Sequence, residues 1–150
     1  MKNKDAMNFK FNSPEQSPGF LLWQLYTMWS RKINQTLKKF NLTHVQFVIM
    51  ANIKWLTQSK KLVSQIEIAK LSRVDPVVVS NVLKNLESKR LIKRKLSQDT
   101  RFKDVKLTSS GLDLLKLTLS AVENFDKTFF KDCPGFITMK NGMKALVELN

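Results

Sequence analysis

The chain has very few of the residues from which catalytic and metal centres are usually built. It holds one cysteine, Cys133, so neither an intrachain disulfide nor a cysteine-based zinc site can form. The single histidine, His44, is accompanied by no nucleophile motif that would indicate a hydrolase. The four glycines form no glycine-rich phosphate loop. We therefore expect a protein that is not an enzyme and that uses no cofactor or metal.

Long hydrophobic runs are missing as well. The N-terminal residues MKNKDAMNFKFN contain no apolar core of a signal peptide. No uninterrupted apolar stretch approaches the length of a membrane span. We expect a cytoplasmic protein that does not contact a membrane.

Acidic residues are scarce relative to basic ones. Twelve Asp and Glu stand against 26 Lys and Arg, which gives a formal net charge of +14. Such a field attracts polyanions, nucleic acid first and an anionic membrane second. The excess is concentrated in one stretch, where Asp99 and Asp104 oppose eight basic residues: Lys89, Arg90, Lys93, Arg94, Lys95, Arg101, Lys103 and Lys106. A charge run that serves solubility alone is the alternative.

Helical periodicity is abundant at both ends of the chain. Apolar residues recur at spacings of three and four over residues 20–41 and again over 112–149, where Pro134 and Gly135 interrupt the pattern. These segments carry more apolar surface than the small module between them can cover. We therefore expect them to be the dimerisation helices of a single domain spanning residues 1–150. A monomer with its termini folded back is the alternative.

Helix start signals define a compact module over residues 43–108. Thr43 with Gln46, and Ser64 with Glu67, have the spacing of a capping box, in which each side chain satisfies a backbone N–H near the other. Each box predicts the start of a helix. The second helix is short, which is typical of the first helix of a helix-turn-helix.

A third helix is predicted from Pro76 to Lys89. Asp75 is a favourable N-cap, and proline at the first helical position lacks only an N–H that would be unpaired anyway. Two short strands, Leu91–Leu96 and Val105–Thr108, follow around a polar tip. The expected fold is mainly α with a small β-wing, in which a winged helix-turn-helix lobe is flanked by N- and C-terminal dimerisation helices.

In a helix-turn-helix the second helix enters the major groove with its N-terminal half at the base edges. The residues that this helix would present to DNA are Pro76, Val77, Val78, Ser80, Asn81 and Lys84. Asn81 can pair with two edge atoms of an adenine, Ser80 can serve several bases, and a valine can pack on a thymine methyl group. Lys84 suits a phosphate. An ordinary solvated helix face is the alternative.

The predicted wing supplies positive charge beside that helix. Its candidate DNA contacts are Arg94, Lys95, Arg101 and Lys103. A basic two-stranded arm can follow the phosphate backbone. Arg101 lies near the tip, where an arginine can enter a narrow minor groove with its enhanced negative potential.

The stretch from Ile66 to Gly111 resembles the MarR family of bacterial winged-helix transcription regulators, and the element order agrees over residues 20–150. The motifs that carry the resemblance are Leu86-Glu87, Leu91-Ile92 with Arg94, Asp99-Thr100-Arg101, and Leu107-Thr108 before Gly111. The resemblance implies that Arg101 is the minor-groove arginine, that Asp99 holds the basic residues of the wing, and that Ser80 faces DNA.

The sequence departs from the family pattern at Arg90, where the family usually has glycine. Glycine there permits a left-handed residue at the helix end. Arginine accepts that conformation at a cost of about 1 kcal/mol. We expect the fold to survive the change.

The resemblance further implies a homodimer on a pseudo-palindromic double-stranded operator, acting as a repressor and released in many members by a small aromatic or phenolic ligand. The family's ligand crevice lies between the dimerisation helices and the DNA-binding lobe. Candidates for it here are Trp23, Trp29, His44, Phe47 and Trp55. The alternative is that these aromatic residues are core. Oxidation of Cys133 is a further option, although no second cysteine can resolve it within the chain.

Two other classes of function remain open. A winged helix can serve as an architectural or protein-interaction module without base readout. An RNA-binding protein is favoured less, because Phe102 is the one aromatic residue placed to stack on a base. A sequence-specific DNA-binding regulator is the leading hypothesis.

Overall fold

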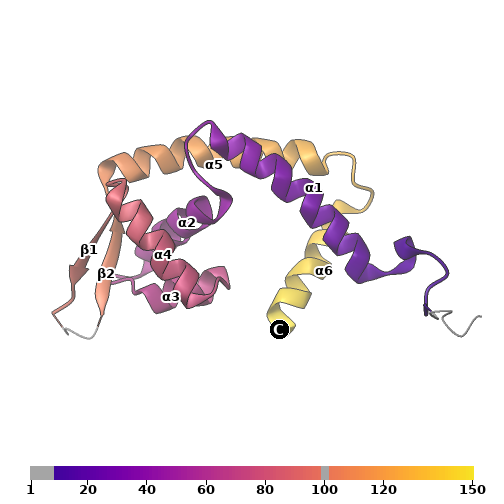
Figure 1. The fold of residues 1–150 in the computed structure, drawn as a ribbon, viewed down its shortest axis with the longest axis horizontal. Coiled ribbons are helices and arrows are strands. Elements are labelled where there is room, and N and C mark those ends of the chain that lie inside the picture. Colours follow the sequence, from indigo (N-terminus) through magenta and orange to yellow (C-terminus); the bar gives the residue numbers. More distant parts are fainter. Residues whose placement is uncertain (1–8, 99–101) are drawn as a thin grey trace, which may run out of the picture. The chain divides into compact units, whose positions relative to one another are not determined.

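The computed structural model describes residues 9–98 and 102–150, and over these it has the predicted fold (Figure 1). The elements in chain order are η1 (Pro14–Gln16), α1 (Pro18–Lys38), α2 (His44–Ser59), α3 (Gln65–Ser72), α4 (Pro76–Ser88), β1 (Ile92–Leu96), β2 (Lys103–Leu107), α5 (Ser109–Phe130) and α6 (Phe136–Leu149). The mainly α fold with a small β-wing is thus confirmed. None of the described helices combines the length and the apolar character that a membrane crossing requires.

The chain divides into two units, residues 1–32 and residues 33–150, with the boundary inside α1. In the first unit, the short η1 turn precedes α1, and the Ser17 hydroxyl accepts a hydrogen bond from the Phe20 backbone N–H at 3.3 Å. The unit exposes several large apolar side chains of α1, namely Phe20, Leu21, Leu22, Trp23, Tyr26 and Met28.

The second unit begins with the end of α1 and a sharp turn into α2. Asn41 adopts a left-handed conformation with φ of 56°, and the Leu42 N–H returns to the Leu37 carbonyl at 3.3 Å. This is a Schellman motif, which pairs carbonyl groups that the helix end leaves free. Thr43 then starts α2 through the predicted capping box with Gln46.

The core of the second unit is built around α2. Its Ile49, Met50 and Ile53 are fully buried, and Phe47 is 6% exposed. They pack with a set of buried side chains from the other elements: Ile33, Leu37, Leu42, Val63, Ile68, Val79, Leu83, Leu86, Ile92, Val105, Leu115 and Val122. This core holds the helix-turn-helix and the wing against α5.

The helix-turn-helix forms as the sequence predicts. Ser64 and Glu67 make the second capping box at the start of α3. Asp75 accepts hydrogen bonds from the Val77 and Val78 backbone N–H groups at 2.8 and 3.3 Å and so caps α4. The helix ends at Ser88 rather than Lys89.

The end of α4 is a second Schellman motif without glycine. Arg90 has φ of 58°, its N–H reaches the Glu87 carbonyl at 2.9 Å, and the Leu91 N–H reaches the Leu86 carbonyl at 3.0 Å. The left-handed conformation expected of Arg90 is therefore confirmed. It directs the chain from α4 straight into the wing.

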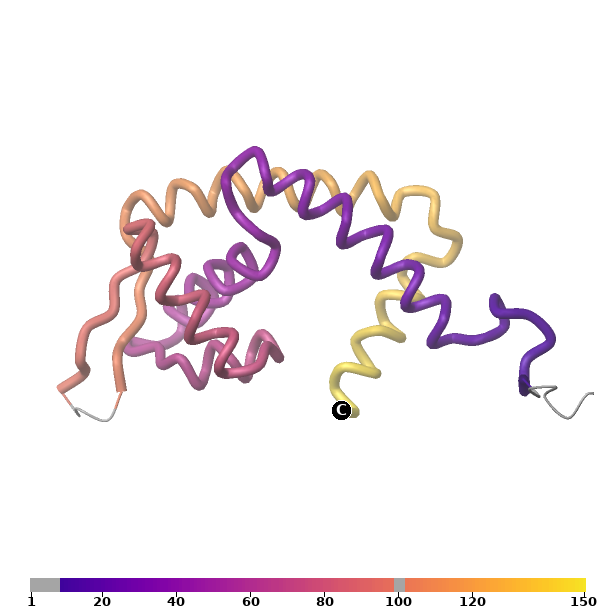
Figure 2. Tube along the Cα trace, viewed as in Figure 1, coloured from indigo at the N-terminus to yellow at the C-terminus, as the bar shows by residue number. Residues whose placement is uncertain are grey.

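The wing is an antiparallel pair of strands, seen side by side in Figure 2. Ile92 pairs with Leu107 and Leu96 with Lys103, so β2 begins at Lys103 rather than Val105 as the sequence predicted. Val63 extends the pair at its edge, because its carbonyl accepts a hydrogen bond from the Val105 N–H at 2.9 Å. The segment before α3 is thereby attached to the wing.

The start of α5 lies directly against the base of the wing. Thr108 caps the helix by accepting a hydrogen bond from the Gly111 N–H at 3.0 Å, and its hydroxyl donates to the Arg90 carbonyl at 2.8 Å. A Cβ added to Gly111 would lie 1.9 Å from the Leu91 carbonyl oxygen, so only glycine allows this approach. The predicted break at Pro134 and Gly135 separates α5 from α6.

Candidate nucleic-acid interface

The N-terminal half of α4 presents a small, mostly exposed surface. Val79, Leu83 and Leu86 are fully buried and fix which face of the helix points inward. The opposite face exposes Val77 to 68% and Val78 to 44%. Of the other predicted contact residues, Pro76, Asn81 and Lys84 are exposed and Ser80 is half-buried. The predicted set thus lies on one side of the helix and is free of the core.

Hydrogen bonds hold α4 against the α1–α2 turn. The buried Gln46 uses its oxygen to accept from the Thr43 N–H at 3.0 Å and its nitrogen to donate to the Asn85 Oδ1 at 2.7 Å. Lys89 donates from Nζ to the Asn41 carbonyl at 2.9 Å. Sequence reasoning assigned Gln46 to the capping box alone, because its second partner is 39 positions away along the chain.

Arg94 joins the wing to α4. Its Nε donates to the Glu87 Oε2 at 2.9 Å, and its Nη2 makes a second, shorter contact with the same oxygen. The Arg94 side chain is 15% exposed. The hydrogen bonds from Arg94 hold the pKa of the Glu87 carboxyl below its ordinary value. The guanidinium predicted to contact DNA therefore has a partner inside the protein.

Asp104 of β2 is an acidic residue of the wing with two partners among the described residues. It is 8% exposed, accepts a hydrogen bond from the Val63 N–H at 2.8 Å, and pairs with Lys106 at 3.0 Å. The sequence indicated this role only weakly, as an acid within a basic strand. Asp99 and Arg101, for which the family resemblance implied specific roles, lie outside the described residues.

Most of the charge of the wing is directed to solvent. Lys93, Lys95 and Lys103 are exposed, and so is Lys84 on α4. Within residues 9–98 and 102–150, none of these four lysines forms an ion pair with an acid. Their positive charge is therefore available to a polyanion beside the exposed face of α4.

The predicted ligand-crevice residues are divided between the two units. Trp23, which is 65% exposed, and Trp29 belong to residues 1–32. His44, Phe47 and Trp55 belong to α2 in the second unit, where Phe47 is core and Trp55 is 67% exposed. Burial lowers the pKa of His44, and the nearby charge of Asp126 opposes this. The alternative of a purely core role holds for Phe47 and fails for Trp55 and Trp23.

Comparison with known proteins places this geometry among winged-helix regulators. The family model described as "ArnR1-like, winged-helix domain" matches residues 38–125. The chain is 40% identical over 140 residues to the HTH-type transcriptional regulator YdcH of Bacillus subtilis (strain 168), covering 93% of this chain and 95% of that protein.

Solved structures of winged-helix regulators have a similar fold. The chain is similar to MepR in the crystal structure of the S. aureus MepR–DNA complex, with a TM-score of 0.78, 28% identity, and coverage of 92% of this chain and 100% of that chain. An E. coli MarR variant complexed with operator DNA has the same fold, with a TM-score of 0.76, 21% identity, and coverage of 85% and 91%.

Proposed function

Because the chain belongs to the MarR family of winged-helix transcriptional regulators and is a DNA-binding protein rather than an enzyme, we propose that it is a sequence-specific repressor. It binds a pseudo-palindromic operator as a homodimer of 150-residue domains in the cytoplasm. The observation that carries the proposal is the exposed N-terminal face of α4 beside a wing in which Lys93, Lys95 and Lys103 are exposed and pair with no acid of residues 9–98 and 102–150.

Base readout is assigned to the exposed face of α4. Asn81 pairs with an adenine edge, Ser80 with a neighbouring base, and Val77 or Val78 packs on a thymine methyl group. Pro76 starts the helix and sets how closely its first turn approaches the groove.

Affinity is assigned to the basic residues around that face. Lys84, Lys95 and Lys103 contact phosphates, which adds a salt-dependent and sequence-independent contribution. Arg101 is assigned to the minor groove and Asp99 to the support of the wing. The pair of Arg94 with Glu87 supports a different role for Arg94, which is to fix the angle between wing and α4.

Two copies are needed because the proposed target has two half-sites. In helix-turn-helix dimers, the recognition helices enter successive major grooves about 34–36 Å apart. The exposed apolar side chains of α1 and α6 support dimerisation through these helices. A small aromatic effector that releases the DNA completes the proposal; in the second unit its candidate contacts are His44 and Trp55, because Phe47 belongs to the core.

A gel shift tests the central claim. Purified protein is titrated onto the duplex upstream of its own gene, with either that duplex or an unrelated one of equal length as unlabelled competitor. We expect the upstream duplex to compete at least about tenfold better, since specific binding exceeds non-specific binding by about 10³ or more. Equal competition by both duplexes would instead support an architectural module without base readout.

A further inference from the structure

The outer face of the wing carries two lysines that no proposed operator contact uses. Side chains alternate between the two faces of a strand. Arg94 points toward α4, where it pairs with Glu87, and Val105 opposite it is buried. Lys93 and Lys106, the neighbouring cross-strand pair, therefore lie on the face of the hairpin that points away from α4.

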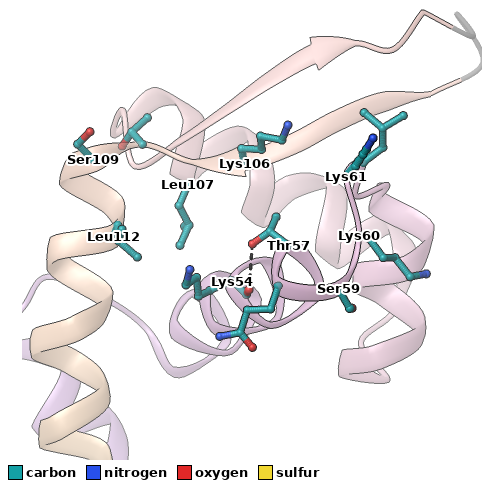
Figure 3. Close-up of a pocket in the computed structure, with 12 residues that line it drawn as sticks. Lys54, Thr57, Ser59, Lys60, Lys61, Lys106, Leu107, Ser109 and Leu112 are labelled. Atoms are coloured by element: carbon teal, nitrogen blue, oxygen red, sulfur yellow. Dashed lines mark hydrogen bonds between the residues drawn. The ribbon is translucent and has the colours of Figure 1, made fainter.

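A groove of about 890 Å³ continues this face onto the body of the lobe (Figure 3). Its described lining comes from the end of α2, the segment between α2 and α3, the end of β2 and the first turn of α5, and includes no residue of α4. Lys106 belongs both to the wing face and to the groove. The groove is therefore separate from the surface proposed to read bases.

The groove has positive charge at separated points. Figure 3 shows Lys54 of α2 and Lys61 at opposite ends of the lining, with Lys106 of β2 between them. Among the acids of residues 9–98 and 102–150, none pairs with Lys54, Lys61 or Lys93. Charges spaced in this way suit a chain that carries several anionic groups better than they suit one small anion.

Two lysines of the wing face repel each other. Lys93 is directly opposite Lys106 in the antiparallel register, and like charges in this relation destabilise a strand pair. Asp104 offsets part of the repulsion, because it pairs with Lys106 at 3.0 Å. Further anionic groups beside the pair would reduce the remainder. The register thus favours a partner with more than one negative charge.

Apolar side chains lie among these lysines. Figure 3 shows Leu107 of β2 and Leu112 of α5 pointing toward Lys54 and Thr57 of α2. Leu62, which is 45% exposed, also lines the groove. A partner that fills the groove therefore needs apolar groups as well as anionic ones.

We propose that this surface, the lysine–leucine face, binds an acidic segment of another protein, an extended stretch in which aspartate or glutamate alternates with apolar residues. The carboxylates of the segment pair with the lysines, and its apolar side chains cover the leucines. Because the face points away from α4, the partner binds while α4 remains open to DNA. The face consists of Lys54, Lys61, Leu62, Lys93, Lys106, Leu107 and Leu112.

Neither DNA nor a second copy of the chain fits the lysine–leucine face as well. A duplex presents phosphates and sugars on its outside, which leaves the leucines without an apolar partner. A second copy offers no acidic segment, because the closest two of its twelve acidic residues, Glu123 and Asp126, are three positions apart. The partner is therefore a different and acidic protein.

A short labelled peptide in which glutamate and leucine alternate is a suitable probe. Its binding to the full-length protein is measured by fluorescence anisotropy at low salt. We expect saturable binding with a Kd of about 100 μM or tighter. The same peptide with glutamine in place of glutamate should bind at least about tenfold more weakly, because it lacks the charge-assisted hydrogen bonds. Serine in place of leucine should weaken binding at least about threefold; equal binding would contradict the role of the leucines.

A pair of double variants locates the binding site of the peptide. Lys54→Gln with Lys61→Gln should weaken the binding of the peptide about tenfold or more. Lys84→Gln with Lys103→Gln removes the same charge from the α4 side of the lobe and should leave the Kd within about twofold. All four side chains are exposed, so both variants should fold. Equal weakening by both pairs, or no saturable binding to the wild type, overturns the proposal.

The peptide measurement contains no DNA, so its result is independent of the proposed operator binding. In the gel shift, the Lys84 and Lys103 substitutions should lower the affinity for DNA, whereas the Lys54 and Lys61 substitutions should change it by less than about twofold. A loss of DNA affinity in the Lys54 and Lys61 variant, without peptide binding to the wild type, would mean that the face holds a phosphate backbone and that the proposal is wrong. Peptide binding without any DNA binding would contradict the proposed function and support the lysine–leucine face.

Discussion

At the scale of single residues, the features that sequence reasoning predicted correctly are those governed by near neighbours along the chain. The capping boxes at Thr43 and Ser64 and the left-handed Arg90 depend on partners within a few positions. The hydrogen bond from Gln46 to Asn85 joins residues 39 positions apart, and that between Val63 and Asp104 joins residues 41 positions apart. No local sequence pattern predicts such contacts.

Arg90→Gly should stabilise the protein. The Arg90 carbonyl accepts hydrogen bonds from Thr108 at 2.8 Å and Ser110 at 3.2 Å through its backbone, which glycine keeps. Removing the Cβ from a left-handed residue should raise the free energy of unfolding by about 1 kcal/mol. Urea denaturation followed by circular dichroism measures this. Arg90→Ala is the matched control and should leave the free energy of unfolding unchanged. An equal increase in both variants would show that the effect comes from the lost charge.

Asn81→Ala should change which base is preferred rather than how tightly any DNA is bound. The side chain is exposed on the α4 face proposed to read bases, so its loss should relax one position of each half-site by about 1–3 kcal/mol. Selection of the bound sequences from a random duplex library measures the preferred base at each position. Lys84→Ala, the control, should weaken all sequences alike and reduce the salt slope by about one. An unchanged operator preference for Asn81→Ala contradicts the assignment.

At the scale of elements, the starts of α2, α3 and α4 were predictable because each helix begins after a capping side chain, whereas the first helix was predicted over residues 20–41 and spans Pro18–Lys38. The boundaries of β2 were less predictable, because a strand of five residues is defined by its pairing partner rather than by its own sequence. A groove lined by the end of α2, the segment after it, the end of β2 and the first turn of α5 (Figure 3) could not have been foreseen, because its lysines come from three separate segments.

The start of α3 should depend on pH through Glu67. Hydrogen bonds from Lys60 and from the Ser64 backbone lower the pKa of this carboxyl to about 2, from an ordinary value of 4.5. The ionised form therefore stabilises the fold above about pH 4.5, and this contribution is lost as the pH falls toward 2.

Glu67→Gln should accordingly be less stable than the wild type at neutral pH, and the difference should close between about pH 4.5 and 2. Denaturation curves across that range test this. Glu123→Gln, at an exposed position of α5, controls for the loss of one negative charge. A constant difference at every pH would show that Glu67 acts through packing instead.

At the scale of the whole molecule, the apolar surface of the terminal helices is the feature that a single chain does not explain. In α6, Ile137 is 70% exposed, Leu146 63% and Leu149 81%. Stable dimers bury about 1,200–2,000 Å² of surface, much of it apolar, and side chains of this kind can supply that area. The periodicity of the sequence predicted the surplus, and the exposed fractions of these side chains now identify which residues carry it.

Sedimentation velocity should therefore detect a dimer, and Ile137→Glu with Leu146→Glu should convert it to monomer by placing charges in the interface. Ile66→Glu introduces a charge at an apolar position of α3, 65% exposed, and should leave the dimer intact. A wild-type monomer at all concentrations would refute the two-half-site operator model while leaving the winged-helix fold untouched.

The contact of Gly111 with Leu91 has a mechanical consequence. Because the first turn of α5 touches the peptide that begins the wing, we expect the helix and the wing to rotate together about this contact. The α5 helix has 22 residues and a length of about 33 Å. A displacement of about 3 Å at the far end of α5 corresponds to a rotation of about 5° about the contact with Leu91. In the proposed homodimer, we therefore expect a small change in the spacing of the two subunits to change the direction of the wing.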